Sequence, residues 1–578
     1  MSTAETTERY DAVARSQCPL TGVLLTDDND CCVSEQVESV RPPEILCRIL
    51  RFAVGSDGVK ALLPFTHVSA RWRGAALGDS SLWTTIYLQQ TTVPLLDMAL
   101  AHAGNRLLTV YIDHHDLDRF ATLWKLINRI EELHYFTNLR QLVPLLSSFG
   151  PAPNLKILDL RPVLTVGREE PIPLISLPVI FSGCLSSLRD LTLANTVAWP
   201  AGLFRSLTSF EYNTPHYPIS PVHVLDALRE SPSIEFIRLA GSCSFPPGLK
   251  LRRVVLRSLV KCTLAGLGIT FLIRFMTVPV SALVTLTGPW FEPGAVSPKF
   301  DDLSTARGLH VLDEVSAISF SINDNAVRLL AENDSGGALD VEVNELSDIS
   351  RDPIFVNFVL SAFEFGRTRP GFKTIKELTL DIDRGRIWAA PEATCFALDV
   401  LGLIHSFPEV EDVTLRGVPP MDLSFILKYL CGDPRVELPC QNIKRLHIGS
   451  IPLHSPRSLL VDLDKLLTER KRAGESLRSF TVKVKCEMLI PAADHCAFLT
   501  SWEGLVEGDV RLEYERSTVK KLPRCRRRNY EDEDDWGDWR EDDEDDESEC
   551  EEMGVDDPDD SCVGWGGWPE KWPKTVGK

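Results

Sequence analysis

A short alternating phrase recurs along the chain and constrains the fold more than any other feature. Each copy has a polar or small residue, an apolar residue, two mostly polar residues and then a strand-like alternation of side chains. The copies are NLKILDL at 154–160, SLRDLTL at 187–193, SLTSFEY at 206–212, SIEFIRL at 233–239, TIKELTL at 374–380, EVEDVTL at 409–415, NIKRLHI at 442–448 and SLRSFTV at 476–482. Helical patterns lie between copies at 222–228, 396–406 and 459–471. Strands that alternate with helices predict a parallel sheet with covering helices, and therefore an α/β fold.

The phrase resembles the strand segment of leucine-rich repeats, in which buried Leu and Ile side chains line a curved parallel sheet. The later copies are 35, 33 and 34 residues apart, whereas the usual repeat has about 20–29 residues. The earlier spacings of 33, 19 and 27 residues are irregular, and the asparagine of the standard repeat is mostly absent. We expect an irregular leucine-rich-repeat-like solenoid with a parallel sheet; the alternative is a non-repeating α/β domain. Residues 245–370 are the least regular part, with candidate strands at 251–256 and 283–286.

The solenoid makes a specific prediction about the alternating positions. Its strands should be parallel and in sequence order, with one set of side chains from each strand buried beneath the sheet. The residues expected in these strands are Leu158, Leu160, Leu191, Leu193, Leu378, Leu380, Val413, Leu415, Leu446 and Ile448.

The segment from Pro42 to Trp83 has a helical pattern instead. Pro42 and Pro43 suit the entry into a first helical turn, where a missing N–H costs nothing. Three apolar faces follow at helical spacing, interrupted by Gly55 and Gly58. A unit of about forty residues is too small to bury so many large apolar groups alone, so some must face a partner or the rest of the chain. The apolar positions are Ile45, Leu46, Ile49, Leu50 and Ala53, then Leu62, Leu63, Phe65 and Val68, then Trp72, Ala76, Leu77, Leu82 and Trp83.

The order PPEIL, VSARWR and DSSLW within this segment is similar to the F-box, a small helical module that docks onto the Skp adaptor of cullin-based ubiquitin ligases. The resemblance is strongest to fungal F-box proteins with irregular leucine-rich repeats. Arg41 stands where the family usually has Leu, and Val40 could replace that anchor from one position back. From periodicity alone, the same helices fit the cap of a larger domain. The resemblance implies adaptor contacts at Pro42, Pro43, Ile45, Leu46, Ile49, Leu50, Val68, Trp72, Leu82 and Trp83.

An apolar face that waits for a partner is exposed in the isolated chain. We therefore expect Ile45, Leu46 and Ile49 to be accessible to solvent.

The sequence lacks the common nucleotide-binding and catalytic motifs. There is no P-loop, Rossmann fingerprint, HExxH or GxSxG, and the 15 cysteines form no CxxC pair, which is typical of free thiols in a reducing compartment. His114–His115 fits a polar loop, because consecutive residues on regular backbone cannot all aim at one ion. Asp494–His495–Cys496 has the residue types of a thiol site, but such sites are assembled in space rather than from sequence neighbours. We expect no enzyme, no catalytic residue, no cofactor and no metal.

The net charge of −21 belongs to one segment. Between Glu531 and Asp560 there are 20 acidic residues and one basic residue, which leaves a charge of −2 for the rest of the chain. This near-neutral remainder lacks the basic excess of a nucleic-acid-binding protein. The longest apolar stretch, 254–275, contains three basic residues and does not fit a membrane span. We expect an intracellular protein, cytoplasmic, nuclear or both, that binds neither nucleic acid nor membrane.

Composition divides the chain into six parts. The basic cluster at 520–528 fits either a nuclear-import address or a solvated linker that pairs with the neighbouring acids. The tail carries five tryptophans, which fit either anchors for a basic, apolar groove or a biased segment without a ligand. The expected parts are a disordered N-terminus at 1–35, the F-box at 36–88, a helical linker region at 89–150 with helices over 92–135, the repeat region at 151–500, a basic linker at 501–528 and a disordered acidic C-terminal tail at 529–578.

The two resemblances together imply a substrate-recognition subunit of an SCF-type E3 ubiquitin ligase. The F-box would bind the Skp-type adaptor and its cullin complex, the repeat region would bind a client protein, and other subunits would transfer ubiquitin. One alternative is an F-box scaffold that acts outside a ligase. A second is a ligand-binding or enzymatic α/β domain fused to a helical module.

The acidic tail gives the first testable prediction. Twenty acids within about thirty residues repel one another and form no continuous apolar face, so the segment cannot offset an ordering entropy of about 1–2 kcal/mol per residue. Deleting residues from Tyr530 onward should leave the melting temperature of the remaining chain nearly unchanged. A large decrease in that temperature would show that the tryptophans pack against the rest of the protein.

Overall fold

The computed structural model describes residues 43–516 except 56, 114–122, 137–143, 145, 162–174, 246–248, 267, 289–307, 323–325, 345–371, 373, 383–393, 432–439, 453–455 and 487–491. All of these belong to the first of two compact units, Met1–Ser517. The N-terminal segment 1–35, the basic cluster, the acidic tail, Arg41, Pro42 and the His114–His115 pair lie outside the described residues.

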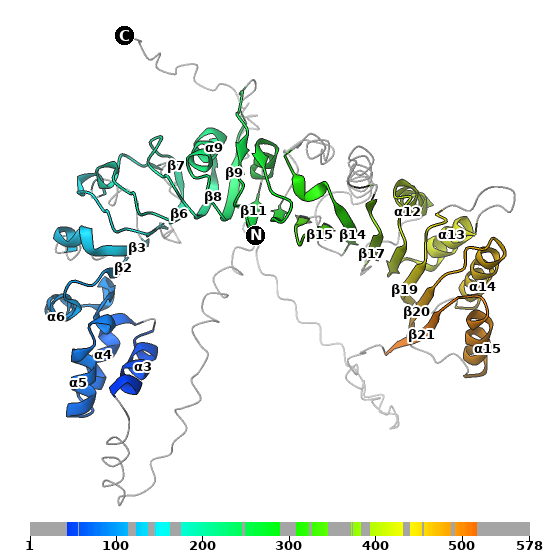
Figure 1. Ribbon diagram of the computed structural model, residues 1–578, viewed down its shortest axis with the longest axis horizontal. Coiled ribbons are helices and arrows are strands. Elements are labelled where there is room, and N and C mark those ends of the chain that lie inside the picture. Colours follow the sequence, from blue (N-terminus) through cyan, green and yellow to red (C-terminus); the bar gives the residue numbers. More distant parts are fainter. Residues whose placement is uncertain are drawn as a thin grey trace, which may run out of the picture. The chain divides into compact units, whose positions relative to one another are not determined.

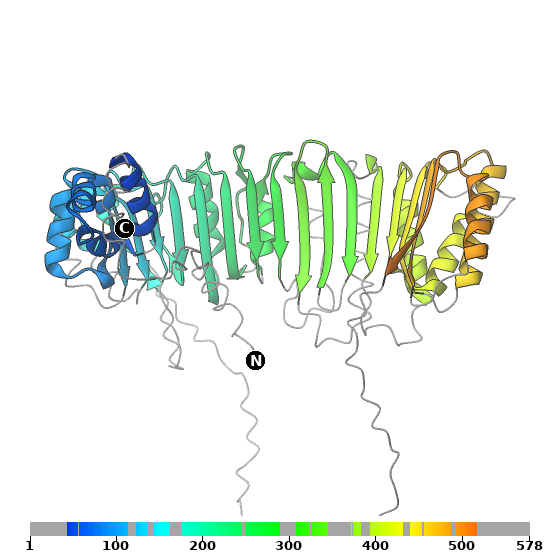
Figure 2. The same cartoon turned by 90° about the horizontal axis from the view of Figure 1, so that it is seen from below.

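The described residues form an α/β fold around one large sheet of seventeen strands (Figures 1 and 2). Its strands follow the order β1–β2–β3–β4–β6–β8–β9–β11–β13–β16–β15–β14–β17–β18–β19–β20–β21. Two short pairs lie outside it, β5 Ile175–Ser176 with β7 Thr196–Ala198 and β10 Val254–Val255 with β12 Met276–Thr277. The strands of the large sheet are β1 Thr85–Tyr87, β2 Leu108–Asp113, β3 Ile130–Phe136, β4 Ile157–Leu160, β6 Asp190–Ala194, β8 Ser209–Ile219, β9 Phe236–Cys243, β11 Lys261–Ala265, β13 Leu283–Thr287, β14 Val315–Ile322, β15 Ala326–Asn333, β16 Ala338–Asn344, β17 Glu377–Ile382, β18 Asp412–Arg416, β19 Arg445–Pro452, β20 Ser479–Cys486 and β21 Asp509–Arg516.

Helices cover one face of the sheet. Figure 1 shows α9 and α12 to α15 along this face, and we call the opposite one the open face. None of the helices in the described ranges combines the length and the apolar character that a membrane span requires. The helices of this layer are α6 Val93–Ala103, α9 Pro221–Glu230, α12 Thr394–Ser406, α13 Pro420–Leu430, α14 Pro456–Arg472 and α15 Ala492–Glu503.

The strand prediction is confirmed for the alternating positions. All ten predicted residues lie in strands, none is more than 5% exposed, and they belong to the large apolar core. The strands that contain them pair in parallel: β4 pairs with β6, β17 with β18, and β18 with β19. Leu158 lies in register with Leu191, and Leu378 with Val413. The predicted helices at 222–228, 396–406 and 459–471 are parts of α9, α12 and α14.

A recurring backbone arrangement begins these strands. The carbonyl of Lys156 accepts hydrogen bonds from the consecutive N–H groups of Arg189 and Asp190, at 2.8 and 3.0 Å. The carbonyl of the residue just before one strand therefore binds the two N–H groups at the start of the next strand. This contact aligns the two strands whatever the length of the connection between them. The same arrangement recurs at the carbonyls of Arg189, Thr208, Glu235, Lys376, Glu411 and Lys444.

The parallel order is interrupted in the middle of the sheet. β14, β15 and β16 form an antiparallel meander, and its last strand, β16, pairs with β13 while its first, β14, pairs with β17. The strands of the predicted positions remain parallel and in sequence order, but the sheet as a whole is only mostly parallel because this meander lies between them. Of the two candidate strands, 283–286 lies in β13, whereas 251–256 contains only β10, Val254–Val255, outside the large sheet.

The region 89–150 is not a helical linker. It contains α6 and the short helix η4, Trp124–Arg129, but also β2 and β3, which pair with each other and with β1 and β4. The burial of β2 alternates strictly, with Leu108, Val110 and Ile112 inward. This alternation matches the two-residue period of a strand and explains why the segment joins the sheet.

Asn333 holds the meander to its neighbours. Its amide nitrogen donates to the carbonyls of Val280 and Val311, at 2.9 and 3.0 Å, and its amide oxygen accepts from the N–H groups of Ser335 and Gly337, at 3.0 and 2.9 Å. The side chain is only 6% exposed, so water cannot replace these bonds.

This network predicts the effect of a single substitution. Asn333→Ala leaves four backbone groups without a partner, and each buried unpaired group costs about 1–3 kcal/mol. We expect the free energy of unfolding to decrease by at least about 2 kcal/mol, measured by chemical denaturation. Asn442→Ala is the matched control, because its exposed amide makes one hydrogen bond, to the Pro408 carbonyl at 2.8 Å. Equal losses in the two variants would contradict this role of Asn333.

Candidate functional site

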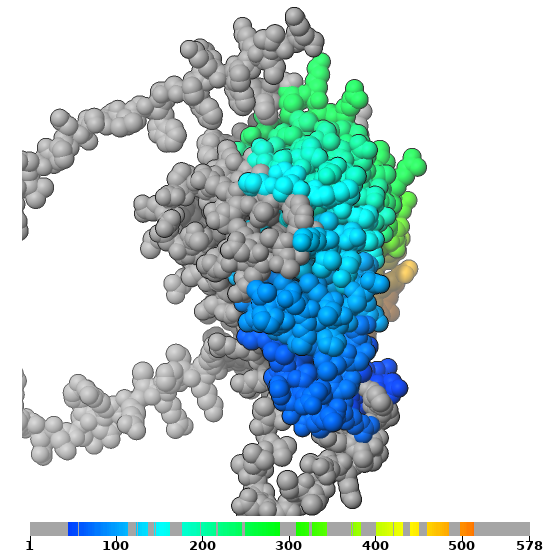
Figure 3. Space-filling view, turned by 90° about the vertical axis from the view of Figure 1, so that its left-hand side faces the viewer, coloured from blue at the N-terminus to red at the C-terminus, as the bar shows by residue number. Residues whose placement is uncertain are grey.

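The segment that resembles an F-box folds into a small helical module at the start of the sheet. We call residues 43–83 the N-terminal module. Figure 3 views this end of the unit, where the blue surface of the module passes without a break into the lighter blue of the first strands. Its elements are α3 Pro43–Val54, η1 Gly58–Ala61, α4 Leu62–Thr66, α5 Ala70–Gly78 and η2 Ser80–Trp83.

Helix α3 has two distinct apolar faces. Leu46, Leu50 and Val54, spaced four residues apart, are buried. Ile45 and Ile49, together with Phe52, lie on another side of the helix. Ile45 is 40% exposed, Phe52 is 88% exposed and Ile49 is half-buried. We call Ile45, Ile49 and Phe52 the α3 stripe.

Hydrogen bonds fix the remaining turns of the module. Ser69 caps α5, because its hydroxyl accepts from the N–H of Trp72 at 3.3 Å. Asp79 caps η2 by accepting from the N–H and the hydroxyl of Ser81, at 3.0 and 2.7 Å. Arg51 of α3 donates to the other Asp79 oxygen at 2.7 Å. These contacts hold α3, α5 and η2 in one arrangement.

The electrostatics of Asp79 follow from the same contacts. Partial burial raises its pKa, but the hydrogen bonds from Ser81 and Arg51 stabilise the carboxylate and outweigh it, so the pKa lies below the ordinary value. A depressed carboxyl pKa stabilises the folded state above the unfolded pKa and loses that contribution as the pH falls through the folded pKa. The Asp79 contacts are therefore fully formed at neutral pH.

The structure separates the predicted adaptor contacts into two groups. Ile45 is exposed, as expected, and Val68 is 57% exposed. Trp72 is half-buried and stacks on Phe65, with ring centroids 5.6 Å apart. Pro42 and the side chain of Pro43 lie outside the described residues, although Pro43 begins α3.

The other predicted contacts lie inside the protein. Leu46 and Leu82 are each 2% exposed, and Leu50 and Trp83 are not exposed. The expectation that Leu46 faces solvent is therefore wrong. The Trp83 indole N–H donates to the Ala76 carbonyl at 2.7 Å. These residues support the module instead of offering a free apolar surface.

Phe52 is the residue that sequence reasoning missed. It lies seven residues after Ile45 and three after Ile49, so helical spacing puts all three on one side of α3. The signal was therefore present in the sequence. Among the large hydrophobic side chains of the described ranges, Phe52 is the most exposed.

A stacked ladder of rings joins the module to the open face. Tyr87, Tyr111 and His134 occupy matched positions on β1, β2 and β3. Their ring centroids are 4.2 and 4.4 Å apart, and both pairs are tilted by 7°. Burial and the neighbouring Tyr87 raise the pKa of Tyr111 to about 12, so the ladder carries no phenolate charge at neutral pH. Gly58 of the module packs against the Tyr87 ring.

Charged side chains continue from the ladder across the open face. His134 lies 3.4 Å from Asp159, and Asp159 accepts from Arg161 at 2.9 Å. Glu211 follows, 3.9 Å from Arg161 and 3.7 Å from Arg238. This part of the open face is therefore polar, and its charged side chains are paired with one another.

The described residues include no group of three or more His, Cys, Asp or Glu side chains placed to hold a metal. Burial raises the pKa of Cys262 to about 12 and that of Cys431 to about 11, and such thiols are poor nucleophiles at neutral pH. The sequence triplet Asp494–His495–Cys496 lies on α15.

Comparison with known proteins adds no relative. No protein-family model matches the chain, and no curated protein matches its sequence. The functional argument therefore rests on the residues and the geometry alone.

The junction of module and sheet predicts the effect of a glycine substitution. Gly58 has φ +59°, and a Cβ there would lie 2.5 Å from the Tyr87 ring and 2.9 Å from the Thr85 carbonyl. Gly58→Ala should destabilise the protein by about 1–3 kcal/mol, measured by thermal unfolding. Gly74→Ala on α5 is the control, since nothing lies within 4 Å of its Cβ position, and alanine there should stabilise the helix by up to about 1 kcal/mol. Unchanged stability of the Gly58 variant would contradict a tight contact between the module and β1.

Proposed function

We propose that this chain is the substrate-recognition subunit of an SCF-type ubiquitin ligase. The observation that carries the proposal is the α3 stripe, an exposed apolar face on a helical module whose sequence resembles the F-box. An aromatic side chain with 88% of its surface in water, as Phe52 has, is the kind of group that a partner buries. The partner in this proposal is a Skp-type adaptor.

The division of α3 into two faces supports this assignment. Leu46 and Leu50 hold the helix to the module core, so the α3 stripe contributes little to folding and is free to serve binding. Val68, after α4, adds a third exposed apolar side chain in the same module. The adaptor contacts proposed here are therefore Ile45, Ile49, Phe52 and Val68, together with the half-buried Trp72.

The sheet suits the second role, that of a client receptor. The recurring backbone arrangement and the buried Leu and Ile positions support a leucine-rich-repeat-like solenoid, whose neighbouring units bury one another's side chains. Its open face presents polar and charged side chains on a rigid sheet. In this function the chain performs no chemistry, but raises the effective concentration of client lysines near the conjugating enzyme.

The test is a charge placed on the α3 stripe. Ile45→Asp combined with Phe52→Asp should weaken binding of a purified Skp-type adaptor by about a hundredfold or more, because a central apolar anchor contributes about 2 kcal/mol or more. Unchanged unfolding of the variant shows that the module is intact. Leu46→Asp is unsuitable, since Leu46 is buried and its change would report on folding.

Met421→Asp is the matched control for this experiment. Met421 lies on α13 and is 86% exposed, so the change also adds a charge to an exposed apolar residue, but far along the chain from the module. We expect unchanged adaptor binding. Wild-type adaptor affinity in the double variant would overturn the adaptor assignment.

Recovery of a cullin with the complex separates the ligase from its alternative. A ligase subunit brings the cullin together with the adaptor, whereas an F-box scaffold outside a ligase binds the adaptor without the cullin. Loss of the cullin in the Ile45→Asp and Phe52→Asp variant, together with the adaptor, would tie both partners to the α3 stripe.

A further inference from the structure

A long segment in the middle of the chain has only positive charges. Residues 236–291 contain seven basic residues and no acidic residue. This imbalance contrasts with the near-neutral charge of the chain outside its acidic tail. Among its basic side chains, Lys250, Arg252, Arg253, Arg257 and Lys261 are exposed.

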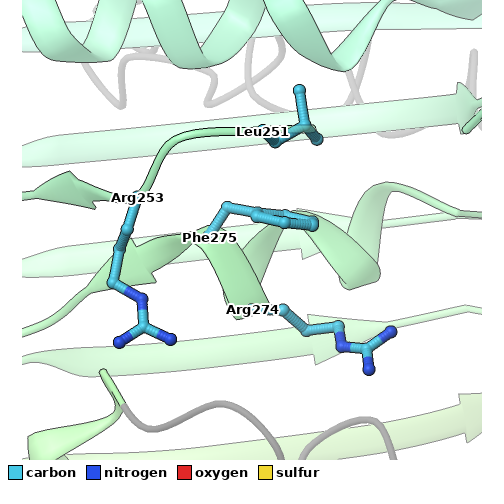
Figure 4. Close-up of a pocket in the computed structure, with 4 residues that line it drawn as sticks. All are labelled: Leu251, Arg253, Arg274 and Phe275. Atoms are coloured by element: carbon cyan, nitrogen blue, oxygen red, sulfur yellow. The ribbon is translucent and has the colours of Figure 1, made fainter. Parts of the chain in front are cut away.

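Two arginines of this segment line a pocket of about 520 Å³ with two apolar residues (Figure 4). Leu251 and Arg253 precede β10, while Arg274 and Phe275 end η6, Ile269–Phe275. The parallel pairing of β10 with β12, Met276–Thr277, brings these two chain segments side by side.

The apolar side of the pocket is held in place from behind. The ring of Phe275 stacks on Phe245 with centroids 6.3 Å apart, and Phe245 meets Phe271 edge-on at 6.2 Å. Phe275 is half-buried by this cluster, so it offers the pocket a fixed ring. In Figure 4, Arg253 and Arg274 extend past this ring toward the same side.

The end of α9 lies against this segment. Arg229 of α9 donates to the Arg252 carbonyl at 3.3 Å, which places the end of α9 against the segment that carries Arg253. Arg229 is paired with Asp226 on the same helix turn, so α9 adds no net charge there. The basic residues of 236–291 therefore give the pocket a field that favours an anion.

We propose that this pocket binds an acidic peptide that carries an aromatic side chain. Guanidinium groups pair with carboxylates through two parallel hydrogen bonds, and the Phe275 ring and Leu251 offer a surface for an aromatic ring. This assignment holds whether or not the chain binds an adaptor. The occupant that we propose is an acidic, aromatic segment of another protein. Residues 531–545 of this chain, EDEDDWGDWREDDED, have the same chemistry and supply the sequence of a probe.

A labelled synthetic peptide with the sequence of residues 531–545 is the probe. We expect it to bind the full-length protein in fluorescence anisotropy, with an affinity that falls as salt rises. Arg253→Ser combined with Arg274→Ser should weaken binding about tenfold or more, because charge-assisted hydrogen bonds are lost. Arg472→Ser combined with Arg511→Ser is the control, because it removes the same charge from exposed sites outside the basic segment.

A second probe separates recognition from general charge attraction. The same peptide with alanine in place of both tryptophans keeps every charge, and it should bind about tenfold more weakly if the aromatic ring enters the pocket. Equal binding of the two peptides, or equal binding by the two double variants, would overturn the proposal.

The source of the natural ligand is decided with the full-length chain. If Trp536→Ala combined with Trp539→Ala in the protein leaves its affinity for the added peptide unchanged, the pocket is free for a segment of another protein, as proposed. An increased affinity would show that the chain's own segment competes for the pocket, and would overturn the assignment to another protein.

Discussion

The interaction on which most of the structure depends is the parallel pairing of successive strands on either side of the β14–β16 meander. No strand of the sheet can bury its apolar side chains alone, and in register with Leu158 the next strand supplies Leu191, then Phe210. The carbonyl ahead of each strand fixes where the following one starts, as at Lys156. Connections of very different length are therefore compatible with one continuous core, because only the short strand must be matched to its neighbour.

The alternation of apolar and polar residues predicted the strands whose form depends on nearby sequence alone. The eight phrases carry both the alternation of a strand and its position, and the last four residues of each lie in a strand of the sheet. The strand order in the meander could not be read this way, because pairing of β13 with β16 instead of β14 is a long-range choice. The hairpin itself had a signal, since NDSGG separates the alternating segments of β15 and β16. Leu123, Ile127 and Ile130 have the spacing of a helix, which predicts a helix here, whereas β3 owes its form to its pairing with β2.

The candidate site shows the same limit at the level of one helix. The spacing in α3 correctly identified an apolar helix, but its apolar arc is wide enough to serve two surfaces. The other helices of the module decide which side of this arc is buried. They pack so that Leu46 is buried and Phe52 is exposed. A similar reason applies to Trp83. Its indole N–H finds a partner in the Ala76 carbonyl within the module, so the residue is a support for the site and not a contact at its surface.

The contact between the module and the sheet bears directly on how a receptor of this kind could work. Gly58 packs on Tyr87, Tyr87 on Tyr111, and Tyr111 on His134, so a continuous series of close contacts leads from the module to the open face. β1 follows η2 without an intervening linker, since Trp83 is separated from Thr85 by one residue. A flexible tether would average over many client positions, whereas packed rings and paired strands allow few. In the function proposed above, a rigid junction of this kind would set the direction in which a client is presented, and the module would then contribute orientation as well as attachment.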